Sequence, residues 1–409
     1  MAKPRCRGTC GNLTIPYPFG IGAGCFYTDG FDVSCEENRT YMHNSSSNME
    51  IYSLNLIGGQ AQVSTFIADK CSNNTDGTST DGWVSTSTAP FFTLSSRANK
   101  LTVVGCNTLA FLGGYNEEEQ NVGAGCFSMC PDKQSVDSSG QCSGMGCCQT
   151  SIAPNLTSLN VTFDSRFNNS EVNSFNPCSY AFVAEQDWFR FEPDYLEGHK
   201  FTDKYKGVST VLDWVAGRES CAQAPKNRTS YACVSTNSSC INSPNATGYL
   251  CACNNGFAGN PYLEGGCQDI NECESPGQYC HGICDNTIGG YHCYCGPGTR
   301  STDPKREPCN PITASERARL TKTFIGVGTE LFQDVAQLAK CCLSTKGEER
   351  PLMTEVAERL KAIRSTWREQ LIEGANEETV CLLENSSQYD PSTTGRHGSL
   401  MALDIETGR

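Results

Sequence analysis

Cysteine placement constrains this chain more than any other feature. Of its 27 cysteines, 24 lie at or before Cys309, and only Cys341, Cys342 and Cys381 lie beyond it. An even number at this density predicts a disulfide framework of up to twelve bridges, formed in an oxidising compartment. A structural zinc site is the competing interpretation, but the repeated short-spaced Cys and His sets typical of zinc are missing. We therefore expect two parts of different chemistry, divided near Cys309.

N-glycosylation sequons are a second sign of secretion. They are concentrated in the cysteine-rich part, which favours an extracellular glycoprotein. The candidate acceptors are Asn12, Asn38, Asn44, Asn73, Asn155, Asn160, Asn168, Asn227, Asn237 and Asn245.

The net charge argues against nucleic acid as a partner. The net charge is −14, so we expect no nucleic-acid partner, because phosphate binding needs a basic surface.

Residues 1–6 do not contain the apolar core of a signal peptide. We expect that the signal peptide has been removed, lost or left out. The best candidate for a membrane span, residues 324–328, is far shorter than the roughly 20 residues required. We expect no membrane span in this chain.

The first 220 residues have the pattern of small β-rich domains. Short apolar runs at 49–57, 62–67 and 101–104 are separated by Gly, Asn, Ser and Thr clusters. Residues 221–309 contain a cysteine every few residues and little apolar sequence between them. Such a segment depends on its bridges, each worth about 2–4 kcal/mol.

The pattern changes after Pro311. Apolar residues recur at three- and four-residue spacing from Leu331 to Cys342 and again from Met353 to Ile363. This spacing predicts two amphipathic helices joined by a loop at 346–350. A Ser/Thr/Gly-rich end follows and is predicted to be disordered.

The N-terminal motif carries the first family resemblance. Residues 6–25 read CRGTCGNLTIPYPFGIGAGC. Pro16 and Pro18 force an extended backbone that presents Tyr17 and Phe19 alternately. The motif resembles the galacturonan-binding domain of plant wall-associated receptor kinases, which implies binding of pectin, as polygalacturonate or oligogalacturonide.

Two interpretations of this motif remain open. Tyr17 and Phe19 either offer flat apolar faces to a sugar or fill a small core beside the Cys10 and Cys25 bridges. Arg7 and Arg39 are the candidate cations for the ligand's carboxylates. Residues 6–125 contain five basic and eleven acidic side chains, so the domain should repel a polyanion unless calcium bridges the two or the cations cluster.

A cysteine-rich segment follows in the same family. The runs GCNTLAF from Gly105, GCFSMC from Gly125 and CSGMGCCQT from Cys142 resemble it. The other interpretation of these cysteines is purely structural, as bridges that hold loops.

Six cysteines from Cys221 to Cys267 resemble an EGF-like module, with a Cys-x-Cys before the last loop. Six cysteines allow fifteen connectivities. The resemblance implies Cys221–Cys240, Cys233–Cys251 and Cys253–Cys267.

A second EGF-like module begins with the acidic stretch Asp269-Ile270-Asn271-Glu272 and contains Cys284-x-Asn286-x4-Tyr291-x-Cys293. Both features resemble the calcium-binding EGF signature; the other interpretation is a calcium-free module with incidental acids. Calcium takes six to eight oxygen ligands, which carboxylates, amides and backbone carbonyls supply. The implied ligands of a structural Ca2+ are Asp269, Ile270, Glu272, Asn286, Thr287 and Gly290. The implied disulfides are Cys273–Cys284, Cys280–Cys293 and Cys295–Cys309.

Residues 335–364 resemble the last two helices of a plant receptor kinase C-lobe. Family members are serine/threonine protein kinases, yet phosphoryl transfer needs a Gly-rich loop, a strand lysine, a catalytic aspartate and a D-F-G motif. None is found in this sequence. We therefore expect a remnant without enzymatic activity.

These observations predict small disulfide-rich β domains followed by a short α-helical remnant. The predicted segments are a galacturonan-binding-like domain (6–105), a cysteine-rich segment (106–220), an EGF-like module (221–268), a calcium-binding EGF-like module (269–310), a linker (311–330), a kinase C-lobe remnant (331–370) and a disordered tail (371–409).

The leading function is pectin and calcium binding by an extracellular, wall- or membrane-associated receptor part. The alternatives are a truncated decoy or co-receptor that contacts full-length receptor kinases through its EGF modules, an active kinase, and an aberrant gene product.

Overall fold

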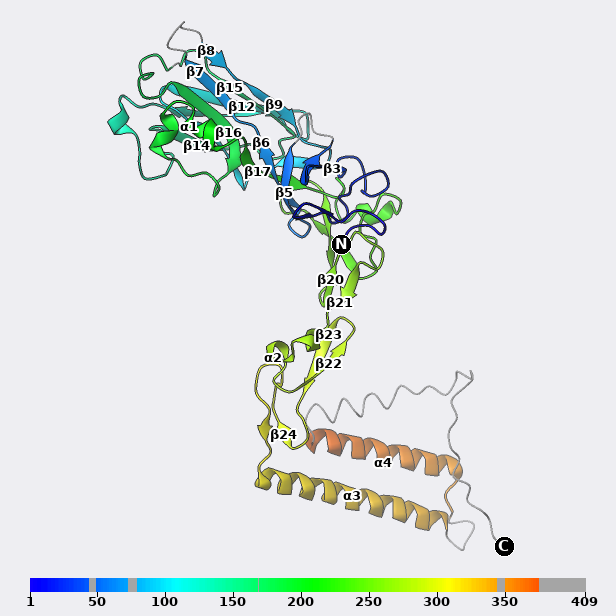
Figure 1. The fold of residues 1–409 in the computed structure, drawn as a ribbon. Coiled ribbons are helices and arrows are strands. Elements are labelled where there is room, and N and C mark those ends of the chain that lie inside the picture. Colours follow the sequence, from blue (N-terminus) through cyan, green and yellow to red (C-terminus); the bar gives the residue numbers. More distant parts are fainter. Residues whose placement is uncertain (44–48, 73–78, 168, 344–349, 375–409) are drawn as a thin grey trace. The chain divides into compact units, whose positions relative to one another are not determined.

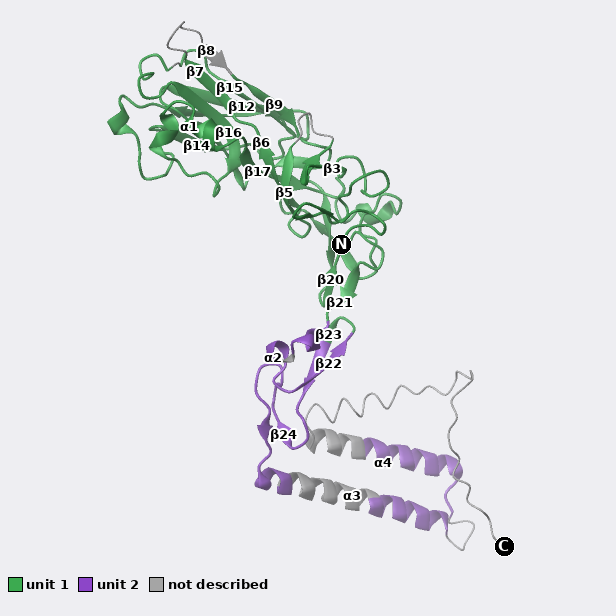
Figure 2. Ribbon diagram, in the orientation of Figure 1, with its two compact units in different colours: residues 1–270, 288–290 green, residues 271–287, 291–409 purple. Residues whose placement is uncertain are grey.

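The computed structural model describes residues 1–43, 49–72, 79–167, 169–343 and 350–374. The predicted fold class is confirmed: short strands and disulfides dominate up to Pro311, and two longer helices follow (Figure 1). The chain divides into two compact units, residues 1–270 with 288–290 and residues 271–287 with 291–409 (Figure 2). Each unit is described separately.

The first unit is built on three antiparallel sheets. A six-stranded sheet has the order β10-β17-β6-β5-β4-β3. Its strands are β3 (Val33–Glu36), β4 (Arg39–Met42), β5 (Glu50–Asn55), β6 (Gln60–Thr65), β10 (Phe92–Leu94) and β17 (Val208–Trp214). In β6 buried and half-buried residues alternate, so one face of this sheet packs inward and the other carries polar and aromatic side chains.

The other two sheets have the orders β14-β11-β16-β7-β8 and β13-β12-β15-β9. The five-stranded sheet contains β7 (Ala68–Ser72), β8 (Ser79–Asp81), β11 (Asn99–Val104), β14 (Cys147–Ser151) and β16 (Cys178–Glu185). The four-stranded sheet contains β9 (Val84–Ser87), β12 (Thr108–Tyr115), β13 (Asn121–Ser128) and β15 (Ser158–Phe163). A short ribbon at the N-terminus pairs β1 (Thr9–Cys10) with β2 (Leu13–Thr14).

The boundary predicted between residues 105 and 106 does not divide these sheets. β6 pairs with β17, and β11 pairs with β14 and β16, so strands from both sides of that boundary share each sheet. Local sequence pattern missed this because the pairing partners lie far apart in the chain.

Two aromatic cores hold the sheets. In the first, the indole of Trp214 contacts Phe19 and Phe31, with ring centroids 5.4 and 5.6 Å apart. In the second, Phe182 on β16 stacks against Phe201, which lies in the segment that follows β16, with ring centroids 5.2 Å apart. That segment contains η2 (Pro193–Leu196) and α1 (Lys200–Lys204); the remaining one-turn helices are η1 (Lys133–Ser135), η3 (Ala224–Lys226), η4 (Glu272–Glu274) and α2 (Pro276–Tyr279).

Four small hairpins form the EGF-like modules. They are β18 (Ser238–Asn242) with β19 (Tyr249–Cys253), β20 (Phe257–Gly259) with β21 (Cys267–Asp269), β22 (Ile283–Thr287) with β23 (Gly290–Tyr294), and β24 (Thr299–Arg300) with β25 (Asn310–Pro311). Their disulfides are Cys221–Cys240, Cys233–Cys251, Cys253–Cys267, Cys273–Cys284, Cys280–Cys293 and Cys295–Cys309, the pairs that the resemblance implied.

Six further disulfides lie before residue 180. They are Cys6–Cys25, Cys10–Cys35, Cys71–Cys178, Cys106–Cys130, Cys126–Cys148 and Cys142–Cys147. Cys126, Cys130, Cys147 and Cys148, the cysteines whose close spacing could have suited zinc, are therefore all in disulfides and offer no thiolate to a metal.

The helical segment begins earlier than its apolar spacing predicted. α3 spans Ala314–Cys342 and α4 spans Met353–Gly374, so most of the predicted linker is helix. The start follows from a capping box, in which Thr313 and Glu316 satisfy each other's backbone N–H groups. α4 packs against α3 and buries Leu338, whereas Phe332 and Val335 are exposed. Residues 375–409 of the predicted tail lie outside the described residues.

Across the described part of the chain, no helix combines the length and apolar character needed to cross a membrane.

Candidate functional site

The N-terminal motif places its two aromatic residues differently. Phe19 is 1% exposed and lies among Phe31, Phe92 and Trp214. Its ring is part of the core and has no face open to a sugar. We therefore withdraw Phe19 as a sugar-contacting residue.

Tyr17 is half-buried. The Lys3 ammonium lies over its ring, 5.6 Å from the centroid, and the Tyr27 ring meets it edge-on at 6.5 Å. Its backbone carbonyl accepts a hydrogen bond from Asn260 Nδ2 at 2.6 Å. Burial raises the pKa of Tyr17. These contacts give Tyr17 a structural role within the first unit.

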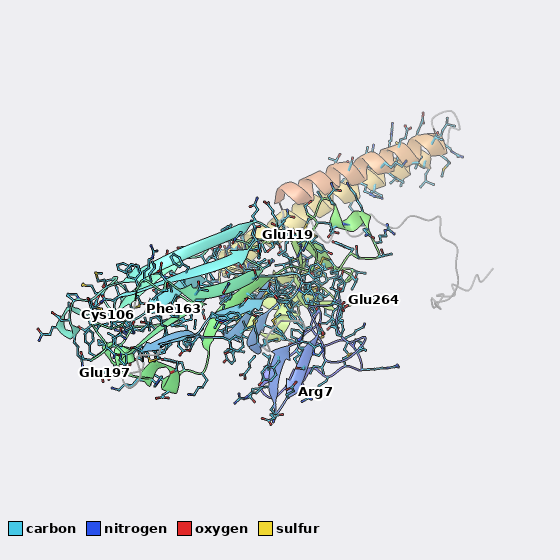
Figure 3. The ribbon with its side chains drawn as sticks, turned by 90° about the horizontal axis from the view of Figure 1, so that it is seen from above. Arg7, Cys106, Glu119, Phe163, Glu197 and Glu264 are labelled. Atoms are coloured by element: carbon cyan, nitrogen blue, oxygen red, sulfur yellow. A yellow bond between two sulfur atoms is a disulfide. The ribbon has the colours of Figure 1, made fainter. Side chains whose placement is uncertain are left out.

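The two candidate arginines lie apart. Arg7, labelled in Figure 3, is exposed, and its Nε donates to the carbonyl of Thr9 at 2.8 Å. Arg39, on β4, lies 3.7 Å from Glu50 on β5. Arg39 lines a groove on the six-stranded sheet, whereas Arg7, Tyr17 and Phe19 do not.

A groove of about 740 Å³ runs over the polar face of the six-stranded sheet. Its floor consists of strand residues, and one wall is the segment that joins α1 to β17. The lining residues used below are Arg39, Tyr41, Glu50, Tyr52, Gln62, Ser64, Phe66, Trp188, Lys204, Tyr205, Lys206 and Ser209. We call this the sheet groove.

Aromatic side chains are the first feature of the sheet groove. Tyr52 is 49% exposed and Phe66 is 42% exposed. Trp188 and Tyr205 meet edge-on with centroids 5.0 Å apart. Tyr41 completes a set of five aromatic rings around one hollow. Such rings can support the apolar faces of sugars.

Cations are the second feature. Lys204 Nζ lies 2.7 Å from the Tyr195 hydroxyl and 3.1 Å from Glu192, and these contacts raise the pKa of Lys204. Lys206 Nζ donates to the carbonyl of Thr202 at 2.8 Å. Lys204 and Lys206 add two charges to that of Arg39; Arg39 and Lys204 are paired with Glu50 and Glu192, whereas Lys206 is bonded to a carbonyl.

The floor of the sheet groove is held by a polar network. Gln62 Nε2 donates to Glu185 at 2.8 Å and to Ser209 Oγ at 2.9 Å. Ser64 and Ser209 are paired directly across β6 and β17. These bonds hold the side chains of Gln62 and Ser209 in place in the floor of the sheet groove.

Reasoning from sequence missed this site. Lys204-Tyr205-Lys206, an aromatic residue between two lysines, was its visible signal. This signal lies far from the N-terminal motif in the sequence, and no local pattern connects the two.

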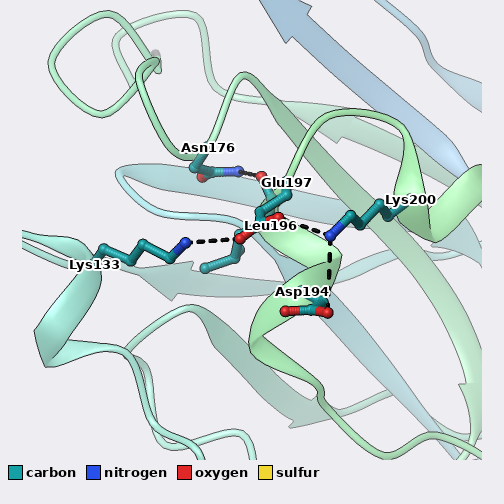
Figure 4. A network of polar contacts seen from close by, with 6 residues as sticks. All are labelled: Lys133, Asn176, Asp194, Leu196, Glu197 and Lys200. Carbon is teal, nitrogen blue, oxygen red and sulfur yellow. Dashed lines mark hydrogen bonds and ion pairs between the residues drawn. The ribbon is translucent and has the colours of Figure 1, made fainter.

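A second charged cluster lies on the loops near η2. Glu197 accepts from Lys133 and from Lys200, each at 2.7 Å, as Figure 4 shows. These lysines lower the pKa of Glu197 to about 2. The cluster joins η1 to η2, and one aromatic residue, Phe175, lines the hollow beside it, against five in the sheet groove.

The sequons fall into three groups. Asn12, Asn38, Asn160 and Asn227 are exposed; Asn155, Asn237 and Asn245 are half-buried; Asn44, Asn73 and Asn168 lie outside the described residues.

The residues implied as calcium ligands lie on short elements of the second EGF-like module. Asp269 ends β21, and its Oδ1 accepts from the Gly289 N–H at 2.6 Å. Ile270 is 37% exposed and follows β21. Asn286 and Thr287 end β22, and Gly290 begins β23.

Glu272 has the surroundings that a cation ligand requires. It begins η4, is 8% exposed, and its Oε2 is buried without a hydrogen-bond partner among the described residues. A buried carboxylate oxygen without a partner is costly. Since η4 packs against β22, which carries Asn286 and Thr287, the residues present fit a calcium ion.

Comparisons with known proteins agree with this arrangement. Residues 6–65 match the family "Wall-associated receptor kinase galacturonan-binding", and residues 269–309 match "Calcium-binding EGF domain". No solved structure matches the chain.

Three relatives from Arabidopsis thaliana illustrate the similarity. Wall-associated receptor kinase 2 is 35% identical over 85% of this chain and 45% of its own length. Wall-associated receptor kinase 5 is 38% identical over 73% of this chain and 39% of its own length. Wall-associated receptor kinase 1 is 35% identical over 72% and 39%. The chain thus aligns with less than half of each relative.

The sheets, disulfides and matched domains define a receptor ectodomain built from a galacturonan-binding domain and EGF-like modules. The chain is a wall-associated receptor kinase-like protein.

Proposed function

We propose that this ectodomain binds pectin, as polygalacturonate or oligogalacturonide, in the sheet groove. The observation that supports the proposal is the clustering of five aromatic rings and three cations around one hollow. The galacturonan-binding match at residues 6–65 covers the floor of this groove but not its Trp188 and Lys204–Lys206 wall.

The clustering resolves a conflict of charge. Residues 6–125 are acidic and should repel a polyanion. Lys204 and Lys206 lie outside that range, and the pairing of β6 with β17 brings their segment to the same groove as Arg39. Charge-assisted hydrogen bonds from these cations would hold uronate carboxylates while the rings support the sugar faces.

Retention on de-esterified pectin tests the proposal. We expect the full chain to be retained and the double variant Tyr52→Ala/Tyr205→Ala to elute early. Tyr294→Ala is the matched control, because Tyr294 is similarly exposed but lies on β23 of the second EGF-like module. Failure of the unaltered protein to bind, with and without calcium, would contradict the function itself.

We also propose that the second EGF-like module binds a structural Ca2+ through Asp269, Glu272 and Asn286 side chains and the carbonyls of Ile270, Thr287 and Gly290. The unpartnered oxygen of Glu272 supports this. The ion would supply the positive charge that this buried carboxylate lacks.

We propose that the chain acts by binding at the cell wall or plasma membrane and not by phosphoryl transfer. The sequence lacks the phosphate-binding and magnesium-binding motifs that the reaction needs. Incubation of purified chain with Mg-ATP tests this, and phosphorylation of the chain or of a substrate protein would contradict it.

A further inference from the structure

A hollow of about 360 Å³ lies on the outer face of the four-stranded sheet, away from the sheet groove. Its centre is one row across three strands: Gly123 on β13 is opposite Gly113 on β12, which is opposite Asn160 on β15. Both Asn160 and Thr162, the two ends of an Asn-Val-Thr sequon, line the hollow. We call it the Asn160 trough.

Phe111 lines the Asn160 trough, and Tyr115 lies just beyond the lining residues on the same strand. Phe111 precedes Gly113 by two residues and is 41% exposed, and Tyr115 follows it by two residues and is 55% exposed. Side chains two residues apart on a strand share a face, so both rings stand on the outer face, about 13 Å apart along β12. That spacing leaves room for a sugar ring between them.

Neither packing nor backbone conformation requires glycine at position 113. A Cβ atom there would meet nothing within 4 Å, and its φ is not in the left-handed region. Gly114 differs, because a Cβ there would come 2.2 Å from the carbonyl of Ser158. Glycine inside a strand weakens the strand and often marks close approach by a ligand. Gly113 therefore points to an occupant outside the sheet.

The chemistry of the lining selects the kind of occupant. Its residues are Phe111, Leu112, Gly113, Gly123, Ala124, Gly125, Asn160 and Thr162, and none is charged. A neutral sugar suits this surface, whereas an acidic polysaccharide would find no cation there. The sequon supplies such a sugar at the trough itself.

We propose that Asn160 carries an N-linked glycan whose first N-acetylglucosamine lies in the Asn160 trough, over Gly113 and Gly123 and between Phe111 and Tyr115. Attachment joins the Asn160 amide nitrogen to C1 of the sugar as the bond from C1 to a lipid-diphosphate donor breaks, and the amide loses a proton. Among the described sequons, this is the one whose asparagine lies within a strand. The glycan thus covers an aromatic sheet face that would otherwise meet solvent.

The test uses the full chain secreted from a eukaryotic host. Glycopeptide mass spectrometry measures occupancy of Asn160, and hydroxyl-radical labelling measures access to Phe111 and Tyr115. We expect an occupied Asn160 and higher labelling of both rings in Asn160→Gln and Thr162→Ala. Enzymatic trimming of the folded protein should have the same effect. Asn227→Gln, at an exposed loop sequon, should leave the labelling unchanged.

Gly113→Leu separately tests whether the sugar lies over Gly113. With the sequon intact, leucine should displace the sugar and raise the labelling of Tyr115, whereas in the Asn160→Gln background it should not. An unoccupied Asn160 would overturn the proposal, and so would an occupied Asn160 whose removal leaves Phe111 and Tyr115 equally accessible.

Discussion

Phe19 packs edge-on against Trp214, with ring centroids 5.4 Å apart. The contact joins the N-terminal motif to the end of β17, a strand of the six-stranded sheet that lies nearly two hundred residues later in the sequence. It shows that the most conspicuous aromatic residue of the motif holds the fold together. The polysaccharide site proposed above lies on the opposite, polar face of that sheet.

The first prediction concerns this contact. Phe19→Ala should lower the free energy of unfolding by about 3–5 kcal/mol, because it removes a buried ring and leaves a cavity. Urea unfolding of the oxidised protein measures it. Trp83→Ala, at a 68% exposed ring, should change the value by no more than about 0.5 kcal/mol. Loss of pectin binding by Phe19→Ala protein that is still folded would restore a direct role for this residue.

The second prediction concerns charge in the sheet groove. Lys206→Ala should weaken oligogalacturonide binding roughly fivefold, since an exposed charge pair is worth up to about 1 kcal/mol. Calorimetric titration at two salt concentrations should also show a smaller salt dependence than in the unaltered protein. Lys226→Ala removes an equal charge at an exposed site outside the groove and should bind normally. Equal losses in both variants would reduce the effect to net charge.

The third prediction concerns calcium. Calcium should raise the melting temperature of the unaltered protein, because an ion that binds only the folded state stabilises it. Glu272→Gln should abolish most of this increase. Without calcium the variant should be at least as stable as the unaltered protein, because a buried unpaired carboxylate is costly.

Differential scanning calorimetry with calcium and with chelator measures both effects. Glu274→Gln, an exposed neighbour, is the matched control. A Glu272→Gln protein with a full calcium response would remove Glu272 from the ligand set.

The fourth prediction concerns pH. Lys133 and Lys200 lower the pKa of Glu197 from 4.5 to about 2. Because the folded-state pKa is the lower one, the stabilisation is present above pH 4.5 and is lost as the pH falls toward 2. Lys133→Met should raise the Glu197 pKa toward its ordinary value, as measured by NMR titration. An unchanged pKa would show that Lys133 does not hold this carboxylate.

Much of the modular part was visible in the sequence. Cysteine number predicted the disulfide framework, and apolar runs at 49–57, 62–67 and 101–104 coincide with β5, β6 and β11. The start of α3 is set by a local signal, the capping box of Thr313 and Glu316, and not by the apolar spacing that begins at Leu331.

The sheet groove could not be derived in this way. Its floor lies on β4, β5, β6 and β17, and its wall consists of Trp188 and residues 204–207. No local pattern states that β17 will pair with β6, or that Ser209 will lie opposite Ser64. Non-local pairing is decided by which faces can be buried together.

Cysteine spacing and its resemblance to EGF-like modules predicted these modules from the sequence, and each bridge there closes a short loop of 11 to 19 residues. The roles of Phe19, Lys206 and Gly113 depend on the assembled sheets. Burial turned Phe19 from a sugar platform into core, strand pairing brought Lys206 to the same groove as Arg39, and register placed Gly113 next to Asn160. Each outcome is a property of faces that exist only after distant strands have joined.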